Sequence, residues 1–510
     1  MAHLGSRRTR ALVLPVGLAL TVSLGFLPAG AATASPVDAR PAAAATDGPK
    51  LSYVVNTRGG HGTVKQVRKA VERAGGTVVI AYDRIGVLVV HSQNPDFARS
   101  VRKVRGVESA GATRTNPIVP TATKDIGVEQ PLTAEQERSA AARATADQDP
   151  MEPLQWDLPA IKADKAHKKS LGSRNVTVAV IDTGVDDTHP DIAPNFDRNA
   201  SANCVSGAPD TTAGSWRPKT GESPHGTHVA GTVAAAKNGI GVTGVAPGVK
   251  VAGIKVGNPD GFFYTEAVVC GFVWAAEHGV DVTNNSYYTD PWMFNCKDDP
   301  DQGALVEAVA RATRYAESRG TVNVAASGNS AEDLAVDAID DVSSPNDTDP
   351  VTRTIDPKTC LDIPAMLPGV VTVSATGAKG LKASYSNYGD GVIDVAAPGG
   401  DSTAYQPPEP PATNGLILST LPGGEYGYMA GTSMASPHVA GVVALIKSRH
   451  PHASAAAVKA LLAVEADATA CGAPYDIDAD GTVDAVCEGG RNHNGFYGAG
   501  VVDALDAVRW

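Results

Sequence analysis

Cysteines are few in this sequence, and their spacing excludes the sites that cysteine most often builds. There are six in 510 residues, and no two of them form a CxxC pattern. A structural zinc site or a thioredoxin-like redox centre is therefore not expected. An even set that begins only at Cys204 instead favours disulfides, as in an exported protein. The spacing leaves the pairing open, with Cys471 and Cys487 as the expected local pair.

Aromatic residues are also scarce, at 5% of a chain that is otherwise ordinary for a globular protein, with 43% hydrophobic and 19% charged residues. One stretch, residues 50–114, is basic, with 12 basic and 4 acidic side chains in a chain of net charge −12. Aromatic side chains do not interleave its basic residues, so nucleic acid is excluded as its partner. The stretch is instead expected to dock on the acidic remainder of the chain, since opposite charges speed encounter and fix orientation.

A long apolar run stands near the N-terminus. Three arginines precede residues 11–27, and the small-residue motif Ala32-Thr33-Ala34 follows them. This order predicts a signal peptide over residues 1–34, and hence an extracellular protein without a membrane anchor after signal removal. A retained anchor is the less favoured alternative because Pro15 and glycines interrupt the run. The twin-arginine and general secretion routes both stay open.

Residues 50–115 are expected to fold as a small α+β domain. The predicted order of strand, helix, strand, strand, helix and strand is ferredoxin-like. In the first helical stretch Val64, Val67 and Val71 fall on one face. We expect linkers on either side, over residues 35–49 and 116–151. The second of these is polar and rich in alanine, threonine and glutamate, which is typical of a linker.

From residue 152 onwards, β-branched runs alternate with helical stretches. The runs are VTVAVID, VKVAGIKV, VDVTNNS, TVNVAAS, VVTVSAT and VIDVAAP. Continuous apolar strands separated by helices predict an α/β fold, with a mainly parallel sheet covered by helices on both faces. Ligands bind such folds at the carboxyl ends of the strands, which is where polar residues end these runs.

An acid, a base and a hydroxyl stand in three further segments. Asp182 ends a predicted strand, His225 enters a helix rich in alanine and glycine, and Ser433 precedes a long apolar run. A hydroxyl is a weak nucleophile that needs an imidazole to take its proton and a carboxylate to hold that imidazole. Taken alone, Ser433 would more simply be a helix cap.

These segments resemble the subtilisin-like serine peptidases, or subtilases. The resemblance rests on VIDTG around Asp182, HGTHVAGT around His225, AASGN around Asn329 and GTSMASPHVAG around Ser433. It implies a subtilisin-like peptidase domain over residues 152–510. It also implies that residues 50–115 are an inhibitory propeptide, which is removed by cleavage within the second linker.

The resemblance implies a role for each residue. Ser433 would attack the peptide carbonyl to form an acyl-enzyme, His225 would act as general base and then acid, and Asp182 would orient the imidazole. Asn329 would donate its amide to the oxyanion beside the Ser433 N–H. The expected activity is that of a secreted serine endopeptidase made as a zymogen, monomeric, which hydrolyses proteins or peptides and needs no catalytic cofactor.

A structural calcium site is a further implication of the resemblance. The expected ligands are side-chain oxygens of Glu152, Asp191 and Asn238 and the carbonyls of Ile240 and Val242, an oxygen set that calcium prefers. The alternative is that this glycine-bearing loop is an ordinary turn. Residues 476–484, DIDADGTVD, resemble half of an EF-hand loop, although a polar turn closed by a disulfide would need the same residues.

Two departures from the family pattern concern substrate binding. Ser286 is followed by Tyr287-Tyr288 where the family has Leu-Gly, and the expected substrate strand that begins at Gly261 continues with Phe-Phe-Tyr. We expect Ser286, Gly261 and Tyr287 to contact substrate in a narrow cleft lined by aromatic rings. The alternative is that these rings pack on inserted loops.

Two rival functions remain from the sequence. A non-catalytic binding protein on a subtilase scaffold is disfavoured because acid, base, nucleophile and oxyanion donor are all present. A processing enzyme with one dedicated substrate would share the chemistry and differ only in specificity. The aromatic departures favour this second alternative over a scavenging enzyme.

Overall fold

The computed structural model describes residues 48–115, 129–403, 414–472, 475–476 and 480–509. The predicted signal peptide and most of the first predicted linker lie outside these ranges. Within them, no helix has both the length and the apolar character needed to cross a membrane.

The N-terminal part folds as a four-stranded antiparallel sheet with two helices. The strands β1 (Leu51–Thr57), β2 (Gly76–Tyr82), β3 (Val87–Ser92) and β4 (Val107–Ala112) stand in the order β2-β3-β1-β4, and the helices are α1 (His61–Arg73) and α2 (Phe97–Val101). The predicted face of α1, with Val64, Val67 and Val71, packs in one core with Leu88 and Phe97. The predicted ferredoxin-like arrangement is confirmed.

A seven-stranded parallel sheet forms the centre of the remaining chain, in the order β16-β15-β11-β9-β6-β8-β7. Its strands are β6 (Thr177–Asp182), β7 (Ala202–Asn203), β8 (Lys250–Lys255), β9 (Val282–Asn285), β11 (Val322–Ala326), β15 (Val371–Thr376) and β16 (Val395–Pro398). Burial on both faces explains why these strands read as continuous apolar runs.

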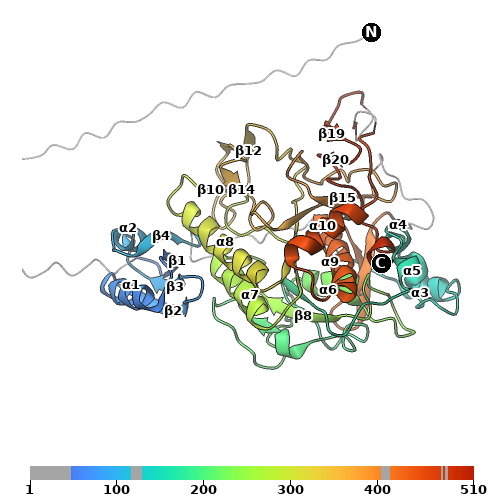
Figure 1. Cartoon of the computed structure of the whole chain (residues 1–510), viewed down its shortest axis with the longest axis horizontal. Coiled ribbons are helices and arrows are strands. Elements are labelled where there is room, and N and C mark those ends of the chain that lie inside the picture. The colour runs from blue at the N-terminus through green and yellow to red at the C-terminus, as the bar shows by residue number, and fades with distance from the viewer. Residues whose placement is uncertain (1–47, 116–128, 404–413, 473–474, 477–479, 510) are drawn as a thin grey trace, which may run out of the picture. The chain divides into compact units, whose positions relative to one another are not determined.

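Helices cover both faces of this sheet. On one face lie α6 (His225–Ala234), α9 (Thr432–Arg449) and α10 (Ala455–Glu465); on the other lie α7 (Thr265–Glu277) and α8 (Gln302–Ser318), which run side by side in Figure 1. Successive side chains of β6 alternate between the two cores, with Val178 and Val180 in the first and Ala179 and Ile181 in the second. The predicted α/β fold is confirmed.

Part of the predicted second linker has regular structure. β5 (Gln130–Pro131) pairs with β18 (Glu425–Met429), which pairs with β17 (Ile417–Leu421), and α3 (Ala134–Ala141) follows. Thr133 and Gln136 form a capping box at the start of α3, each side chain bonded to the other's backbone N–H. Residues 129–142 are therefore attached to the C-terminal domain by a strand and a helix.

Three disulfides and several short elements complete the described chain. The bridges are Cys204–Cys270, Cys296–Cys360 and the predicted Cys471–Cys487. The second bridge joins β10 (Asn295–Cys296) to β14 (Cys360–Leu361). The other short elements are η1 (Glu152–Leu154), α4 (Asp157–Ala160), α5 (Ala163–Ala166), η2 (Arg198–Ala200), β12 (Ile339–Asp341), β13 (Arg353–Ile355), β19 (Gly489–Gly490), β20 (His493–Asn494) and η3 (Asp506–Val508).

Candidate active site

The predicted site residues stand at the carboxyl ends of neighbouring strands and at the starts of two helices. Asp182 ends β6, Ser286 follows β9 and Asn329 follows β11, and these three strands are adjacent in the sheet. His225 is the first residue of α6, and Ser433 is the second of α9. Parallel strands end at one edge, so this arrangement places acid, base and hydroxyl at the edge where α/β proteins bind ligands.

Asp182 and His225 form a buried pair. The distance from His225 Nδ1 to Asp182 Oδ1 is 2.8 Å, and the two side chains are 1% and 0% exposed. The backbone N–H of Thr183 also donates to Asp182 Oδ1, at 2.6 Å. A buried carboxylate at Nδ1 holds the proton on that nitrogen, so Nε2 is the ring atom that can accept a proton.

Ser286 and Ser433 hold each other through reciprocal hydrogen bonds. The Ser433 hydroxyl donates to the Ser286 carbonyl at 3.2 Å, and the Ser286 hydroxyl donates to the Ser433 carbonyl at 2.9 Å. Pro437 lies four residues further along α9 and has no N–H for the Ser433 carbonyl. Ser286 supplies the missing donor, so α9 accommodates the proline without leaving a buried carbonyl unsatisfied.

The other two hydroxyls at the start of α9 bond to strand ends. Thr432 donates its backbone N–H and its hydroxyl to Asn329 Oδ1, both at 2.8 Å. The Ser436 hydroxyl donates to Asn284 Oδ1 at 2.7 Å. Both residues thus fix the start of α9 against β11 and β9.

Two N–H donors flank one space beside Gly431. The oxygen of the Asn329 amide accepts both hydrogen bonds from Thr432. The amide nitrogen, Asn329 Nδ2, is therefore the end of that group that is left to donate. A β-carbon placed on Gly431 would lie 3.5 Å from Asn329 Nδ2 and 3.5 Å from the backbone nitrogen of Ser433. The start of a long helix also favours negative charge. These donors can therefore bind the oxyanion of a tetrahedral intermediate.

Sequence comparison identifies the family. The sequence model described as the Subtilase family matches residues 173–500, which contain Asp182, His225, Asn329 and Ser433. The chain belongs to the subtilase family. This subtilase is 34% identical to subtilisin BL of Lederbergia lenta over 296 residues, which are 58% of this chain and 85% of that relative. It is a serine endopeptidase by family and acts on protein substrates.

Solved structures share the subtilase fold. The epidermin leader peptide processing serine protease of Staphylococcus aureus superposes with a TM-score of 0.62 at 22% identity, over 90% of this chain and 98% of that one. Fervidolysin of Fervidobacterium pennivorans superposes with a TM-score of 0.57 at 24% identity, over 93% of this chain and 62% of that one. At these identities the likeness shows the fold alone.

The residues predicted to contact substrate form an aromatic cluster next to Ser286. The ring of Tyr287 stacks on Phe263 with centroids 4.6 Å apart, and its hydroxyl donates to Asn285 Oδ1 at 3.1 Å. Phe262 stacks on Tyr264 in the same segment, which begins at Gly261. Burial, and then the charge of Asp182, raise the pKa of Tyr287 well above its usual value. Contact with substrate stays a prediction for these residues.

A second buried Asp–His pair was not singled out from the sequence. His438 Nε2 lies 2.9 Å from Asp157 Oδ2, and His438 Nδ1 lies 2.7 Å from the Met434 carbonyl. Both ring nitrogens are thus engaged, so this histidine has no free nitrogen with which to take a proton from Ser433. The pair holds α9 against α4, and no local motif signals it.

Subtilases commonly bind calcium, but Glu152 and its surroundings do not fit a calcium ligand set. Glu152 Oε2 lies 2.7 Å from the ammonium of Lys237 and accepts the backbone N–H of Asp149 at 3.0 Å. A lysine therefore supplies the positive charge that the calcium prediction assigned to a metal. Asp149, which the sequence interpretation missed, accepts from Gly239 N and Thr243 Oγ1, both at 2.7 Å.

Two of the other predicted ligands, Asp191 and Asn238, are engaged by protein donors as well. Asp191 accepts hydrogen bonds from Val242 N at 3.0 Å, from the Tyr426 hydroxyl at 2.9 Å and from Asn238 Nδ2 at 3.2 Å. Asn238 thus turns its N–H₂ group toward the carboxylate, and its oxygen accepts Ile240 N at 3.1 Å. Hydrogen-bond donors surround this carboxylate, whereas calcium would need oxygen ligands there. The loop is therefore an ordered turn.

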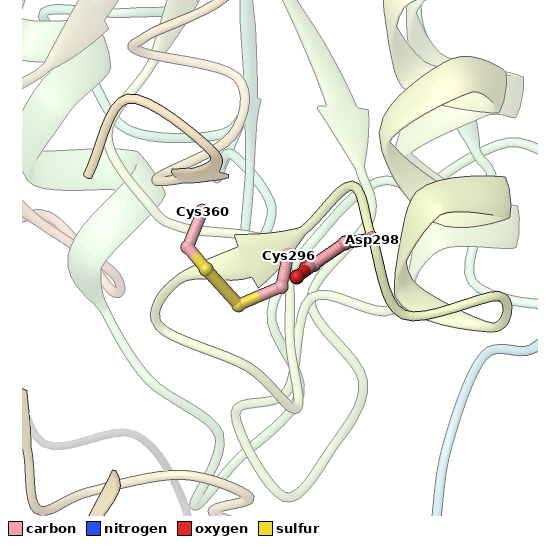
Figure 2. A group of neighbouring side chains, drawn as sticks. All are labelled: Cys296, Asp298 and Cys360. Carbon is pink, nitrogen blue, oxygen red and sulfur yellow. A yellow bond between two sulfur atoms is a disulfide. The ribbon is translucent and has the colours of Figure 1, made fainter. Parts of the chain in front are cut away.

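Two other groups of residues were considered for a metal. In the EF-hand-like stretch, Asp476 accepts the backbone N–H groups of Asp480 and Gly481 at 3.2 and 2.9 Å; residues 477–479 lie outside the described residues, so a calcium role there stays a prediction. Figure 2 shows Cys296 and Cys360 close to Asp298, but the two sulfur atoms are bonded to each other. No thiolate is therefore available to a metal there.

Proposed function

We propose that this subtilase is a secreted endopeptidase, made as a zymogen and active as a monomer, in which Ser433, His225 and Asp182 form the catalytic triad. The observation that carries the proposal is the buried contact between Asp182 and His225 at 2.8 Å. The two N–H donors beside Gly431 support it, because they suit the oxyanion that this chemistry produces. Export is supported by the signal-like N-terminus and the three disulfides.

The proposed reaction proceeds in two halves. Ser433 Oγ attacks the peptide carbonyl carbon while its proton passes to His225 Nε2, and Asn329 Nδ2 and Ser433 N bind the oxyanion. The C–N bond then breaks as His225 returns the proton to the leaving amine, which leaves an acyl-enzyme. In the second half, a water molecule attacks the acyl-enzyme as serine attacked the peptide, with His225 again as the base, and the carboxylic acid is released from Ser433. Asp182 stays ionised and stabilises the imidazolium throughout.

The zymogen proposal rests on contacts of residues 50–115 with α8. Arg311 donates to the Thr57 carbonyl at 2.7 Å, and Asn56 Nδ2 donates to the Ala304 carbonyl at 2.9 Å. The ordered segment that begins before β5 belongs with the C-terminal domain, so the proposed maturation cleavage falls within residues 116–128. That range narrows the linker predicted from the sequence.

A Ser433→Ala variant tests the proposal against a non-catalytic binding protein. The variant should remain a full-length precursor and should hydrolyse no peptide, because no other hydroxyl in the proposed mechanism can replace Ser433. Ser448→Ala is the matched control, since it makes the same change near the other end of α9, where that hydroxyl bonds to the Ala444 carbonyl. The control should mature normally.

Cleavage by a host protease must be separated from self-processing. Purified Ser433→Ala precursor is therefore incubated alone and with the mature wild-type enzyme, and the chain length is followed by mass spectrometry. Processing only with added enzyme supports the proposal. Processing of the pure variant alone, or hydrolysis equal to that of the control, would refute the assignment of Ser433.

A further inference from the structure

A buried carboxylate lies at the start of α7, and an arginine of the propeptide region pairs with it. Glu266 is 2% exposed, and the guanidinium of Arg114 forms an ion pair and a hydrogen bond with its Oε1 atom. The same guanidinium lies over the ring of Tyr264, with 4.0 Å between Arg114 Cζ and the ring centroid. Arg114 therefore combines a charge pair with a cation–π contact.

The next residue of the chain is held in the same way. The backbone N–H of Thr115 donates to Asp347 Oδ2 at 2.8 Å, and its hydroxyl donates to Asp347 Oδ1. Asp347 is fully buried. Two successive residues are thus bound by two buried carboxylates, Arg114 through its side chain and Thr115 through its backbone N–H and its hydroxyl.

The Glu266 pocket connects to the proposed nucleophile through the aromatic cluster. Tyr264 directly follows Phe263, whose ring stacks on Tyr287 at 4.6 Å. Tyr287 in turn follows Ser286, which exchanges hydrogen bonds with Ser433. Arg114 and Thr115 also precede the proposed maturation segment in the chain. An arginine in this pocket would therefore lie on the N-terminal side of a scissile bond.

Removal of the propeptide changes the electrostatics of this pocket. Burial opposes the charge of Glu266, but the charge of Arg114 together with hydrogen bonds to the carboxylate holds the pKa of that carboxyl below its usual value. Without Arg114 the carboxylate loses its main counter-charge, which is costly. The first turn of α7 offsets only part of this cost. A new guanidinium would restore the lost pair.

We propose that Glu266 and Tyr264 form a specificity pocket that selects an arginine on the N-terminal side of the scissile bond in protein and peptide substrates, that Asp347 holds the residue after it, and that Arg114 occupies this pocket in the zymogen as a substrate would. The inference rests on the proposed endopeptidase function and adds a substrate class to it. Arginine is favoured over lysine because its planar guanidinium can bind the carboxylate and stack on Tyr264 together.

The first experiment uses only the mature wild-type enzyme. Internally quenched peptides of one parent sequence carry arginine, lysine, citrulline or glutamine at each of several positions before the scissile bond. At one position arginine should raise kcat/KM by about tenfold or more over citrulline, since buried charge pairs discriminate strongly against loss of one partner. Lysine should fall between them. Equal kcat/KM for arginine and citrulline at every position would overturn the proposal.

The second experiment assigns the preference to Glu266. In Glu266→Gln the arginine-to-citrulline ratio of kcat/KM should fall to about two or less, because the remaining amide carries no charge. Glu317→Gln is the matched control. Glu317 lies near the C-terminal end of the neighbouring helix α8, where its carboxylate pairs with Lys459. The control should keep the wild-type ratio. A full arginine preference in Glu266→Gln would refute the role of this residue.

An active-site titration separates failure of this inference from failure of the proposed function. The same samples are titrated with a serine-directed phosphonate, and every kcat is expressed per labelled site. An enzyme that is labelled and hydrolyses peptides without arginine preference contradicts the pocket alone. A sample that neither reacts nor hydrolyses any peptide contradicts the proposed function, and the pocket falls with it.

Discussion

At the scale of single residues, the site depends on pairs that fix the orientation of each polar group. The amide of Asn329 is oriented by Thr432, and the hydroxyl of Ser433 is held by Ser286. The motif residues Asp182, His225, Asn329 and Ser433 could be predicted because each lies in a distinctive local segment. The hydrogen bonds between Ser286 and Ser433 could not be predicted, since the two residues come from different parts of the chain.

Substitution of Asn329 tests the proposed oxyanion donor. Asn329→Ala should lower kcat by about 10²- to 10³-fold with little change in KM, because the amide is proposed to bind the oxyanion of the intermediate rather than the ground state. The measurement is steady-state hydrolysis of a quenched peptide. Asn329→Asp is the informative companion, since it keeps an oxygen for Thr432 and loses the N–H₂ donors. If Asn329→Asp retained wild-type kcat, the role of Asn329 would be to hold Thr432 alone.

At the scale of elements, α6 packs against the hairpin of β17 and β18. Gly231 allows this approach because a β-carbon there would collide with the hydroxyls of Ser419 and Thr420. His228 Nε2 lies 3.1 Å from the carbonyls of Ile417 and Gly427, one on each strand. The nitrogen must carry a proton to bond to two carbonyls, so His228 is a packed helical histidine.

The position of His228 predicts a pH dependence of stability. Burial, and then the neighbouring His225, lower the pKa of His228 to about 3 in the folded protein, against 6.5 for an ordinary histidine. Between these values the unfolded chain binds a proton that the folded chain does not. The free energy of unfolding should therefore fall by about 1.4 kcal/mol for each unit of pH below 6.5 through this group.

Urea unfolding of the Ser433→Ala precursor between pH 7 and about pH 4 measures this dependence without self-digestion. His228→Gln in the same background keeps an N–H donor and removes the titration, so its slope should be smaller by roughly 1.4 kcal/mol per unit of pH. Identical slopes would contradict the assignment.

Long elements were predictable and short ones were not. All six apolar runs named from the sequence contribute strands to the central sheet, because double-sided burial imposes a strong apolar pattern. Two-residue strands such as β5 and β7 form through backbone pairing that leaves no such pattern. The capping pair Thr133 and Gln136 was a readable signal for α3 within the predicted linker.

At the scale of the whole molecule, the charge asymmetry predicts docking but not the individual pairs. Arg102 of the basic region pairs with Asp301, as the overall charges suggest. Arg311 and Glu108 pair with the opposite polarity, the base on α8 and the acid on β4. Net charge governs attraction at a distance, whereas contacts depend on local shape and hydrogen bonding.

Whether the predicted calcium ligands fit a metal is also decided at the level of the whole fold. The resemblance supplied the right loop and the buried Asp191, but it could not supply Lys237 as the partner of Glu152. Sequence correspondence transfers positions, whereas ligand geometry depends on which groups converge in three dimensions. In this loop, protein N–H, O–H and ammonium groups bind the carboxylates that the prediction assigned to a metal.

The most direct test of the endopeptidase account is to identify the residue that reacts with a serine-directed phosphonate. The wild-type protein is labelled, digested and mapped by tandem mass spectrometry, with the Ser433→Ala variant treated alongside. The account predicts one covalent adduct, on Ser433, at close to one label per chain, together with loss of peptide hydrolysis. An adduct on another residue, or full hydrolysis after Ser433 is labelled, would contradict it.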